Sequence, residues 1–132
     1  MSVFLNILMY ALFFVMPITA FIAGYMSVNK PPKEINGVMG YRTKLSMASQ
    51  EAWDYANRRM GEMFLKNSVY MLALGVVATV ILLVTKVSYT SVTFSIAIVV
   101  IMVLQTLLMT LPMAKVEQEL ADEVYKKESN ES

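Results

Sequence analysis

The chain has 132 residues, 57% of them hydrophobic, and its 11 basic and 10 acidic residues leave a net charge of +1. Soluble domains hold ~45–50% apolar residues, so this composition predicts an integral membrane protein with a single membrane domain over residues 1–132. The chain contains no Cys and no His. It therefore has no disulfide and lacks the thiolate and imidazole groups that most often bind metals, and we expect no metal site and no cofactor.

Three uncharged, apolar stretches can each form a membrane-spanning helix, which needs ~20 residues. They cover residues 3–26, 69–85 and 92–113, and the second is close to the lower length limit. Pro17 lies inside the first stretch, where neighbouring helices or the hydroxyl of Thr19 can satisfy the carbonyl that it frees, so we expect a kinked helix. A cleaved signal peptide is the alternative, and the missing basic n-region and cleavage motif argue against it.

The distribution of charge predicts how these helices are oriented. Residues 86–91 form a short link, so the second and third helices should make an antiparallel hairpin. Seven Lys and Arg residues lie in residues 29–66 and three in the tail of residues 115–132, against one in the link. The positive-inside rule therefore predicts an external N-terminus, with residues 29–66 and the tail in the cytoplasm.

Between the first two spans lies a polar segment, residues 36–61, with turn and helix-start signals. Asn36-Gly37 and Gly40 indicate turns, and Ser46 or Ser49 can cap a helix. Small and apolar residues then recur at spacings of three and four: Ala48, Ala52, Ala56, Met60 and Met63. We expect a separate, cytoplasmic amphipathic helix here, which either packs on the spans or lies on the headgroups, and the small residues favour packing.

Three side chains in this segment invite a functional interpretation. Arg42 follows a glycine turn, where its planar guanidinium can bind a phosphate or carboxylate through two hydrogen bonds; the alternative is a charge that only sets topology. Trp53 suits either the membrane interface or a packed anchor. Asn57 lies one helical turn later and either hydrogen-bonds the turn of residues 40–43 or faces solvent.

The remaining polar residues offer little chemistry. Gln105 lies near the middle of the third span and suits a hydrogen bond between helices, and no ionisable residue lies deep in any span. No nucleophile, base or metal ligand has a recognisable spacing, and no basic, aromatic-rich surface suits nucleic acid, so we expect neither an enzyme nor a nucleic-acid-binding protein. The tail carries Val116, Leu120 and Val124 at four-residue spacing and should form a solvated extension of the third helix.

The pattern of residues 36–61, followed by two apolar spans, resembles the Sdp immunity protein family of small bacterial membrane proteins. The resemblance covers roughly residues 1–115 and rests on Asn36, Gly40-Tyr41-Arg42-Thr43, Ser46, Ser49, Ala52-Trp53, Ala56-Asn57 and Gly61. It implies an immunity protein that protects the membrane against a toxic peptide. The binding residues that it implies for a toxin, a lipid or a partner are Asn36, Gly40, Tyr41, Arg42, Thr43, Ser46, Trp53 and Asn57.

One relative in that family also captures a transcriptional repressor at the membrane. The present chain carries the three-span module without the further N-terminal spans of larger members, so the resemblance supports self-protection more than signalling. Two other classes stay open: a small transporter or lipid-binding enzyme module, and an accessory subunit of a larger membrane complex. The partners expected are membrane lipids and a toxic peptide or membrane protein, while self-association and the identity of the toxin stay open.

Overall fold

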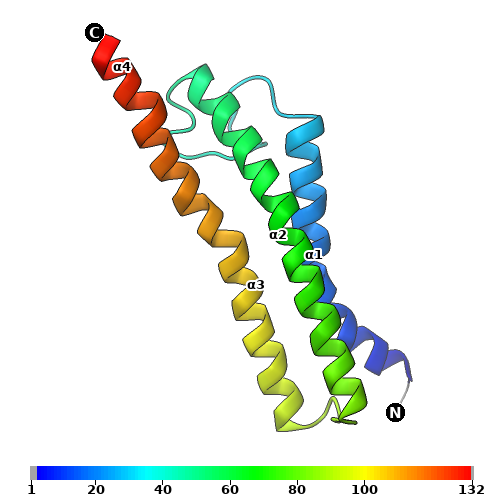
Figure 1. Cartoon of the computed structure of the whole chain (residues 1–132). Helices are drawn as coiled ribbons and strands as arrows, with labels where there is room; N and C mark the ends of the chain where they lie inside the picture. The colour runs from blue at the N-terminus through cyan, green and yellow to red at the C-terminus, as the bar shows by residue number, and fades with distance from the viewer. Residues whose placement is uncertain (1–2, 132) are drawn as a thin grey trace.

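The structure is a computed structural model that describes residues 3–131, without the side chains of Glu123, Val124, Lys127 and Glu128. Its helices, in chain order, are α1 (Val3–Asn29), α2 (Gln50–Val84), α3 (Val92–Glu119), the π-helix η1 (Leu120–Tyr125) and α4 (Lys126–Glu131). The described residues contain no strand, and α1, α2 and α3 form an elongated bundle (Figure 1). All three are long and apolar enough to cross a membrane, which confirms the prediction of an all-α protein with three such helices.

The prediction of a separate amphipathic helix between the first two spans is wrong. Helix α2 begins at Gln50 and continues without interruption to Val84, so the predicted helix and the second span are one element of 35 residues. Ser49, one of the two predicted caps, accepts a hydrogen bond from the Ala52 amide at 3.1 Å. No proline lies between residues 50 and 84, and Gly61 alone does not break the helix, so nothing ends it at the membrane edge.

The long α2 packs chiefly on α1, and two glycines set how closely the helices approach. A Cβ atom added at Gly24 would lie 2.9 Å from the carbonyl oxygen of Gly61, and one added at Gly61 would lie 2.7 Å from the Cβ of Ser27. Any side chain here would force the helices apart. Gly61 therefore permits a close approach between α1 and α2.

Pro17 leaves α1 continuous because a neighbouring helix satisfies the carbonyl that it frees. Pro17 has no N–H to donate to Phe13 four residues earlier, and the Gln105 side chain in α3 donates its amide Nε2 to that Phe13 oxygen at 2.9 Å. A second, longer bond of 3.4 Å joins Nε2 to the carbonyl of Met71 in α2. Gln105 is fully buried and so ties the three helices together, as its central position predicted. The first turns of α1 lean away from the rest of the helix (Figure 1).

At the other end of the bundle, a side-chain amide also binds the carbonyl that a second proline, Pro112, leaves free. Pro112 lies inside α3 and frees the carbonyl of Leu108, and Asn67 in α2 donates its Nδ2 to that oxygen at 2.7 Å. This bond was not predicted, because the sequence alone does not place Asn67 opposite Leu108. Each proline thus creates an acceptor that a side-chain amide from another helix uses as an interhelical link.

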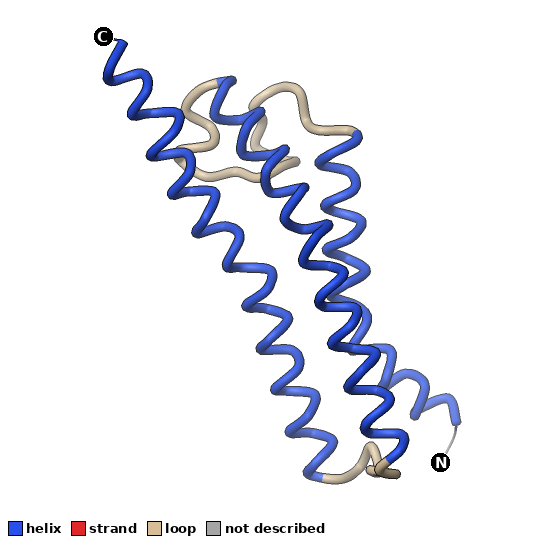
Figure 2. The backbone as a smooth tube through the Cα atoms, in the orientation of Figure 1, coloured by secondary structure: helices blue, strands red, loops and turns tan. Residues whose placement is uncertain are grey.

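The two ends of the bundle differ in composition. The hairpin end holds the link of residues 85–91 and an apolar cluster of buried residues, namely Phe13, Leu82, Phe94 and Ile101. The signature end holds the loop of residues 30–49, the start of α2 and the helices that follow residue 113 (Figure 2). The predicted signature residues all lie at the second of these ends.

Candidate functional site

The loop of residues 30–49 runs across the signature end and begins with an Asn36 turn. The Asn36 side-chain oxygen accepts hydrogen bonds from the amides of Val38 and Met39 at 2.9 and 2.7 Å. The guanidinium of Arg42 donates to the carbonyl of Gly37, which folds its side chain back over the same turn. Arg42 and Asn36 therefore lie together on one turn, with Arg42 exposed to solvent.

Gly40 occupies a position that no other residue fits. Its φ of +99° is in the left-handed region that side chains disfavour. An added Cβ would lie 2.6 Å from the side-chain oxygen of Asn57 and 2.8 Å from the Cγ of Pro32. The absence of a side chain lets the loop backbone lie directly on α2 and on the proline pair that ends α1.

Trp53 and Asn57, both in α2, fix the position of that loop backbone. Trp53 is fully buried and donates its indole N–H to the carbonyl of Pro32 at 2.7 Å, so it is a packed anchor. Asn57 is 1% exposed; its oxygen accepts from the Tyr41 amide at 2.7 Å, and its Nδ2 donates to the Trp53 carbonyl at 2.9 Å. The expected bond between Asn57 and the glycine turn is present.

Thr43 and Ser46 close the next turn by reciprocal hydrogen bonds. The Thr43 amide donates to the Ser46 hydroxyl oxygen at 2.7 Å, and the Ser46 amide donates to the Thr43 hydroxyl oxygen at 3.1 Å. The Ser46 hydroxyl in turn donates to the Tyr41 carbonyl at 3.0 Å. Ser46 is fully buried, so its role here is to shape the loop, while Ser49 caps the helix.

Glu117, in the last turn of α3, fastens this loop to the opposite side of the bundle. Its Oε1 accepts from the Tyr41 hydroxyl at 2.8 Å and from the Thr43 hydroxyl at 2.5 Å. Partial burial of Tyr41, and then this bond to a carboxylate, raise its pKa well above the usual value. Tyr41 therefore stays a neutral donor at physiological pH, and its bond to Glu117 does not titrate there.

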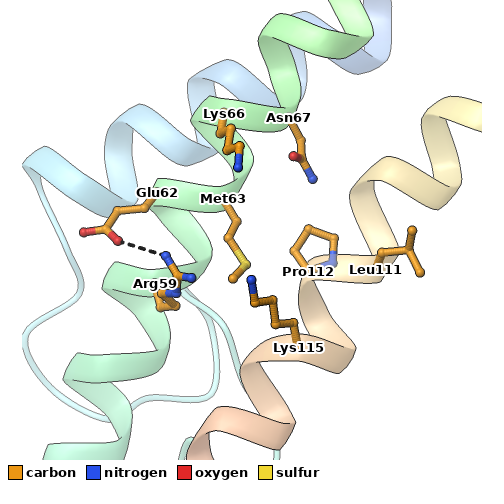
Figure 3. Close-up of a pocket in the computed structure, with 8 residues that line it drawn as sticks. All are labelled: Arg59, Glu62, Met63, Lys66, Asn67, Leu111, Pro112 and Lys115. Carbon is orange, nitrogen blue, oxygen red and sulfur yellow. Dashed lines mark ion pairs between the residues drawn. The ribbon is translucent and has the colours of Figure 1, made fainter.

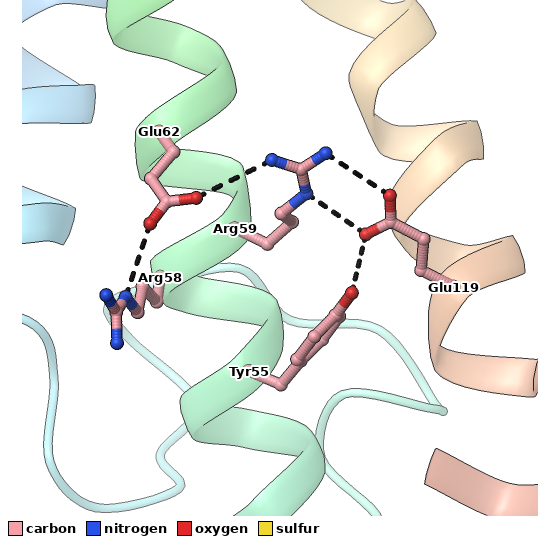
Figure 4. Close-up of polar contacts among 5 residues, drawn as sticks. All are labelled: Tyr55, Arg58, Arg59, Glu62 and Glu119. Atoms are coloured by element: carbon pink, nitrogen blue, oxygen red, sulfur yellow. Dashed lines mark hydrogen bonds and ion pairs between the residues drawn. The ribbon is translucent and has the colours of Figure 1, made fainter. Parts of the chain in front are cut away.

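A second carboxylate, Glu119, fastens α2 to the same end of α3 (Figure 4). Its Oε2 accepts from the Tyr55 hydroxyl at 2.7 Å and from the Arg59 Nε at 3.1 Å. Arg59 also lies 3.5 Å from a carboxylate oxygen of Glu62, whose other oxygen pairs with Arg58 at 3.2 Å. We call the bonds made by Glu117 and Glu119 the clasp.

Apolar contacts lie beneath the clasp. One cluster of buried side chains joins α2 to α3 and η1, and its members are Ala52, Ala56, Met60, Met63, Val116 and Leu120. The expected packing of the small-residue stripe on the protein's own helices is confirmed, although Ala48 is exposed. The expectation of a solvated tail is wrong for residues 116–120, because Val116 and Leu120 are fully buried against α2, while Val124 lies outside the described side chains.

Five of the eight predicted site residues therefore form one hydrogen-bonded unit, namely Tyr41, Thr43, Ser46, Trp53 and Asn57, and Gly40 packs closely against it. Asn36 and Arg42 lie on its exposed rim. Sequence reasoning missed Glu117 and Glu119, which complete the unit from α3. The four-residue spacing of Val116 and Leu120 was the available signal, since a buried stripe there brings the adjacent carboxylates to the loop and to Arg59.

The exposed charge of this unit is the guanidinium of Arg42. Arg42 makes no ion pair with any described residue. Across residues 3–131 no three side chains of the His, Cys, Asp or Glu type gather closely enough to hold a metal ion. The arrangement offers a rigid loop with an exposed cation, which can bind an anionic group.

These features define a class of helical membrane protein with a structured polar segment at one end of its spans. The chain belongs to the SdpI/YfhL protein family, whose model matches residues 33–114. It is 39% identical over 54 residues to the uncharacterized protein YfhL of Bacillus subtilis (strain 168), a match that covers 41% of this chain and about half (49%) of that relative. No solved structure matches the chain.

Proposed function

We propose that this protein is an immunity-type membrane protein that protects the cell carrying it from a secreted killing peptide. Membership of the SdpI/YfhL family supports this function. The observation that carries it is the loop of residues 30–49, because the side-chain hydrogen bonds that fix it to α2 and α3 would be unnecessary for a simple connection between two spans. A loop held this firmly is suited to binding, since little conformational entropy is lost when a rigid surface meets its partner.

We also propose that the signature end faces the cytoplasm and the hairpin link faces outside. Ten of the eleven Lys and Arg residues, all except Lys86, lie at the signature end or in the tail that follows it. The positive-inside rule favours this orientation. The peptide would then be met from the cytoplasmic face of the membrane, or its effect relayed there through the bundle.

In this proposal Arg42 is the contact residue and the buried side chains are positioning residues. Arg42 is exposed, unpaired with any described carboxylate, and held by the Gly37 carbonyl on the rim of the loop. Trp53 and Asn57 act through the backbone that carries it. An anionic group on the peptide or on a membrane partner would be bound by the planar guanidinium through paired hydrogen bonds.

The test is survival of sensitive cells that express the protein and are challenged with a killing peptide of the Sdp type. We expect Arg42→Ala and Arg42→Lys both to lose protection, because Lys keeps the charge and loses the planar geometry. Lys44→Ala is the matched control, since Lys44 is an exposed cation two residues away in the same loop and should be replaceable. Membrane levels of each variant are measured in parallel.

Two results would remove parts of the proposal. Full protection by both Arg42 variants at normal membrane levels would remove Arg42 from the contact surface. Failure of the wild-type protein to protect against any such peptide would reject the immunity function, and a role as an accessory subunit or small transport module would then be favoured.

A further inference from the structure

A cavity separate from the signature loop lies between α2 and α3. It has a volume of about 340 Å³, and its lining residues are Arg59, Glu62, Met63, Lys66, Asn67, Leu111, Pro112 and Lys115 (Figure 3). The volume is within the range of small-molecule sites. Figure 3 shows Lys115 extending from α3 toward α2, and Lys66 of α2 also lines the cavity, so that each helix contributes a cation.

The cavity sits at the edge of the predicted membrane core. In α2 no charged residue follows Lys66, and in α3 none precedes Lys115. The two lysines are therefore the first charges met on leaving the apolar part of each helix, where headgroups replace hydrocarbon. Leu111, one turn before Lys115, is 61% exposed and opens the cavity toward the lipid.

The charges around the cavity are not balanced within the protein. Its lining holds three cations and one carboxylate. That carboxylate, Glu62, is already shared between Arg58 and Arg59, and Arg59 also pairs with Glu119. Lys66 and Lys115 form no ion pair or hydrogen bond with any described residue. Lys66 thus has no carboxylate partner among the described residues, and Lys115 has as its nearest counter-charge Glu119, whose pKa it helps to lower but which already pairs with Arg59.

We propose that this cavity binds a phosphate group, and that the phosphate belongs to an anionic lipid of the adjacent leaflet. Lysine ammonium groups bind phosphate as point charges, and basic pockets between transmembrane helices suit lipid headgroups. Lys66 and Lys115 contact the phosphate from opposite helices, while Leu111 and Pro112 contact the start of the lipid chain. The site is independent of the immunity function, because it uses none of the residues of the signature loop.

The experiment measures lipid binding to the purified full-length chain by native mass spectrometry. Phosphatidylglycerol is compared with phosphatidylcholine, which has the same phosphate but no net charge. We expect wild-type protein to prefer phosphatidylglycerol, and Lys66→Gln/Lys115→Gln to bind it about 25-fold more weakly, at about fivefold per lysine. Lys44→Gln/Lys126→Gln is the matched control, since it removes the same charge from exposed residues outside the cavity and should keep the preference.

A second arm distinguishes a lipid from a soluble anion. Inorganic phosphate is added to lipid-free protein, and the melting temperature is followed for the same variants. A rise that depends on Lys66 and Lys115, without any preference for phosphatidylglycerol, would support a phosphate site filled from solution. Lys66→Arg/Lys115→Arg should keep binding and show that loss in the Gln variant is due to charge and not to misfolding.

The proposal is overturned if the cavity variant and the control variant lose the same amount of lipid affinity. It is also overturned if neither phosphatidylglycerol nor inorganic phosphate binds with any dependence on the two lysines. In either case the lysines only extend to the headgroup region to escape the hydrocarbon.

Discussion

The hairpin end and the signature end use different interactions to hold the same helices. At the hairpin end, aromatic rings make the contacts, as in the edge-to-face pair of Tyr10 and Phe94 with centroids 5.4 Å apart. At the signature end, carboxylates, hydroxyls, an indole N–H and an amide bind a loop to two helices. Hydrogen bonds are directional, so those at the signature end fix the conformation of the loop. Apolar contacts like those at the hairpin end bring helices together without fixing a loop conformation.

This difference indicates where function resides. Contacts that only hold the helices of a bundle together can be made by apolar side chains, as at the hairpin end. The network around Asn57 and Glu117 buries polar groups, and each must find a partner or lose stability. Such a network is justified when one loop conformation is needed, which here is the conformation that places Arg42 on the rim.

The largest expected effect comes from removing an anchor at either end. Trp53→Ala and Phe94→Ala each remove a fully buried aromatic ring, and we expect a loss of about 3–5 kcal/mol in unfolding free energy from each. Only Trp53→Ala should release the loop, because Trp53 alone binds the Pro32 carbonyl. Trypsin cleavage after Arg42 and Lys44, measured on purified protein, should accelerate in Trp53→Ala and not in Phe94→Ala. Equal acceleration in both would show that the loop is held by the bundle as a whole.

Two glycines of the loop provide a sharper comparison within the signature end. Gly40→Ala places a Cβ against Asn57 and Pro32 at a φ of +99°, and it should cost about 1–3 kcal/mol of stability. Gly37→Ala is the control, since an added Cβ there meets nothing within 4 Å. Thermal melting of the two variants in detergent measures the difference. If Gly37→Ala were as destabilising as Gly40→Ala, the close approach at Gly40 would not explain the loss of stability in Gly40→Ala.

The side-chain amide of Gln105, which compensates for Pro17, should make a moderate contribution to stability. Gln105→Leu leaves the Phe13 carbonyl without a donor in a buried position, and we expect a loss of about 0.6–2 kcal/mol. Thr110→Val is the control, because its hydroxyl is exposed and binds carbonyls of its own helix. Melting temperatures of both variants test this. An unchanged melting temperature for Gln105→Leu would mean that the Phe13 carbonyl finds another partner.

The smallest effect concerns the bond between Tyr41 and Glu117. Tyr41→Phe removes it and should cost about 1 kcal/mol near neutral pH. The pKa of Tyr41 is raised in the folded state, so its contribution is complete below the unfolded value of about 10 and is lost as the pH rises further. Stability measured between pH 8 and 11 should therefore fall more steeply for wild type than for Tyr41→Phe. Parallel curves would contradict a tyrosine held protonated by the clasp.

The sequence allowed the spans and the role of Gln105 to be predicted, because each depends on local pattern or on one polar group in an apolar stretch. It offered Ser49 as one of two possible caps and a bond to the glycine turn as one of two possible roles for Asn57. The continuity of α2 was not predicted, because the change from the polar segment of residues 36–61 to the apolar stretch of residues 69–85 suggests two separate helices. This change in composition marks the position along a single helix, α2, at which its surroundings become apolar. The clasp was missed because it joins residues 60 or more positions apart, and no local pattern reports which carboxylate meets which donor.

The central claim is that the loop and the tail are clasped together at one end of the bundle, and that this end faces the cytoplasm. The absence of native Cys makes it directly testable, because any introduced one is unique. Ala48 and Asn130 are exposed at the signature end, whereas Ser46 is buried and unsuitable, and Ser88 is exposed in the hairpin link. An impermeant thiol reagent added to intact cells should label Ser88→Cys and leave Ala48→Cys and Asn130→Cys unlabelled until the membrane is opened. Labelling of Ala48→Cys and Asn130→Cys from opposite faces would contradict the clasp, and the fully reversed pattern would contradict the orientation.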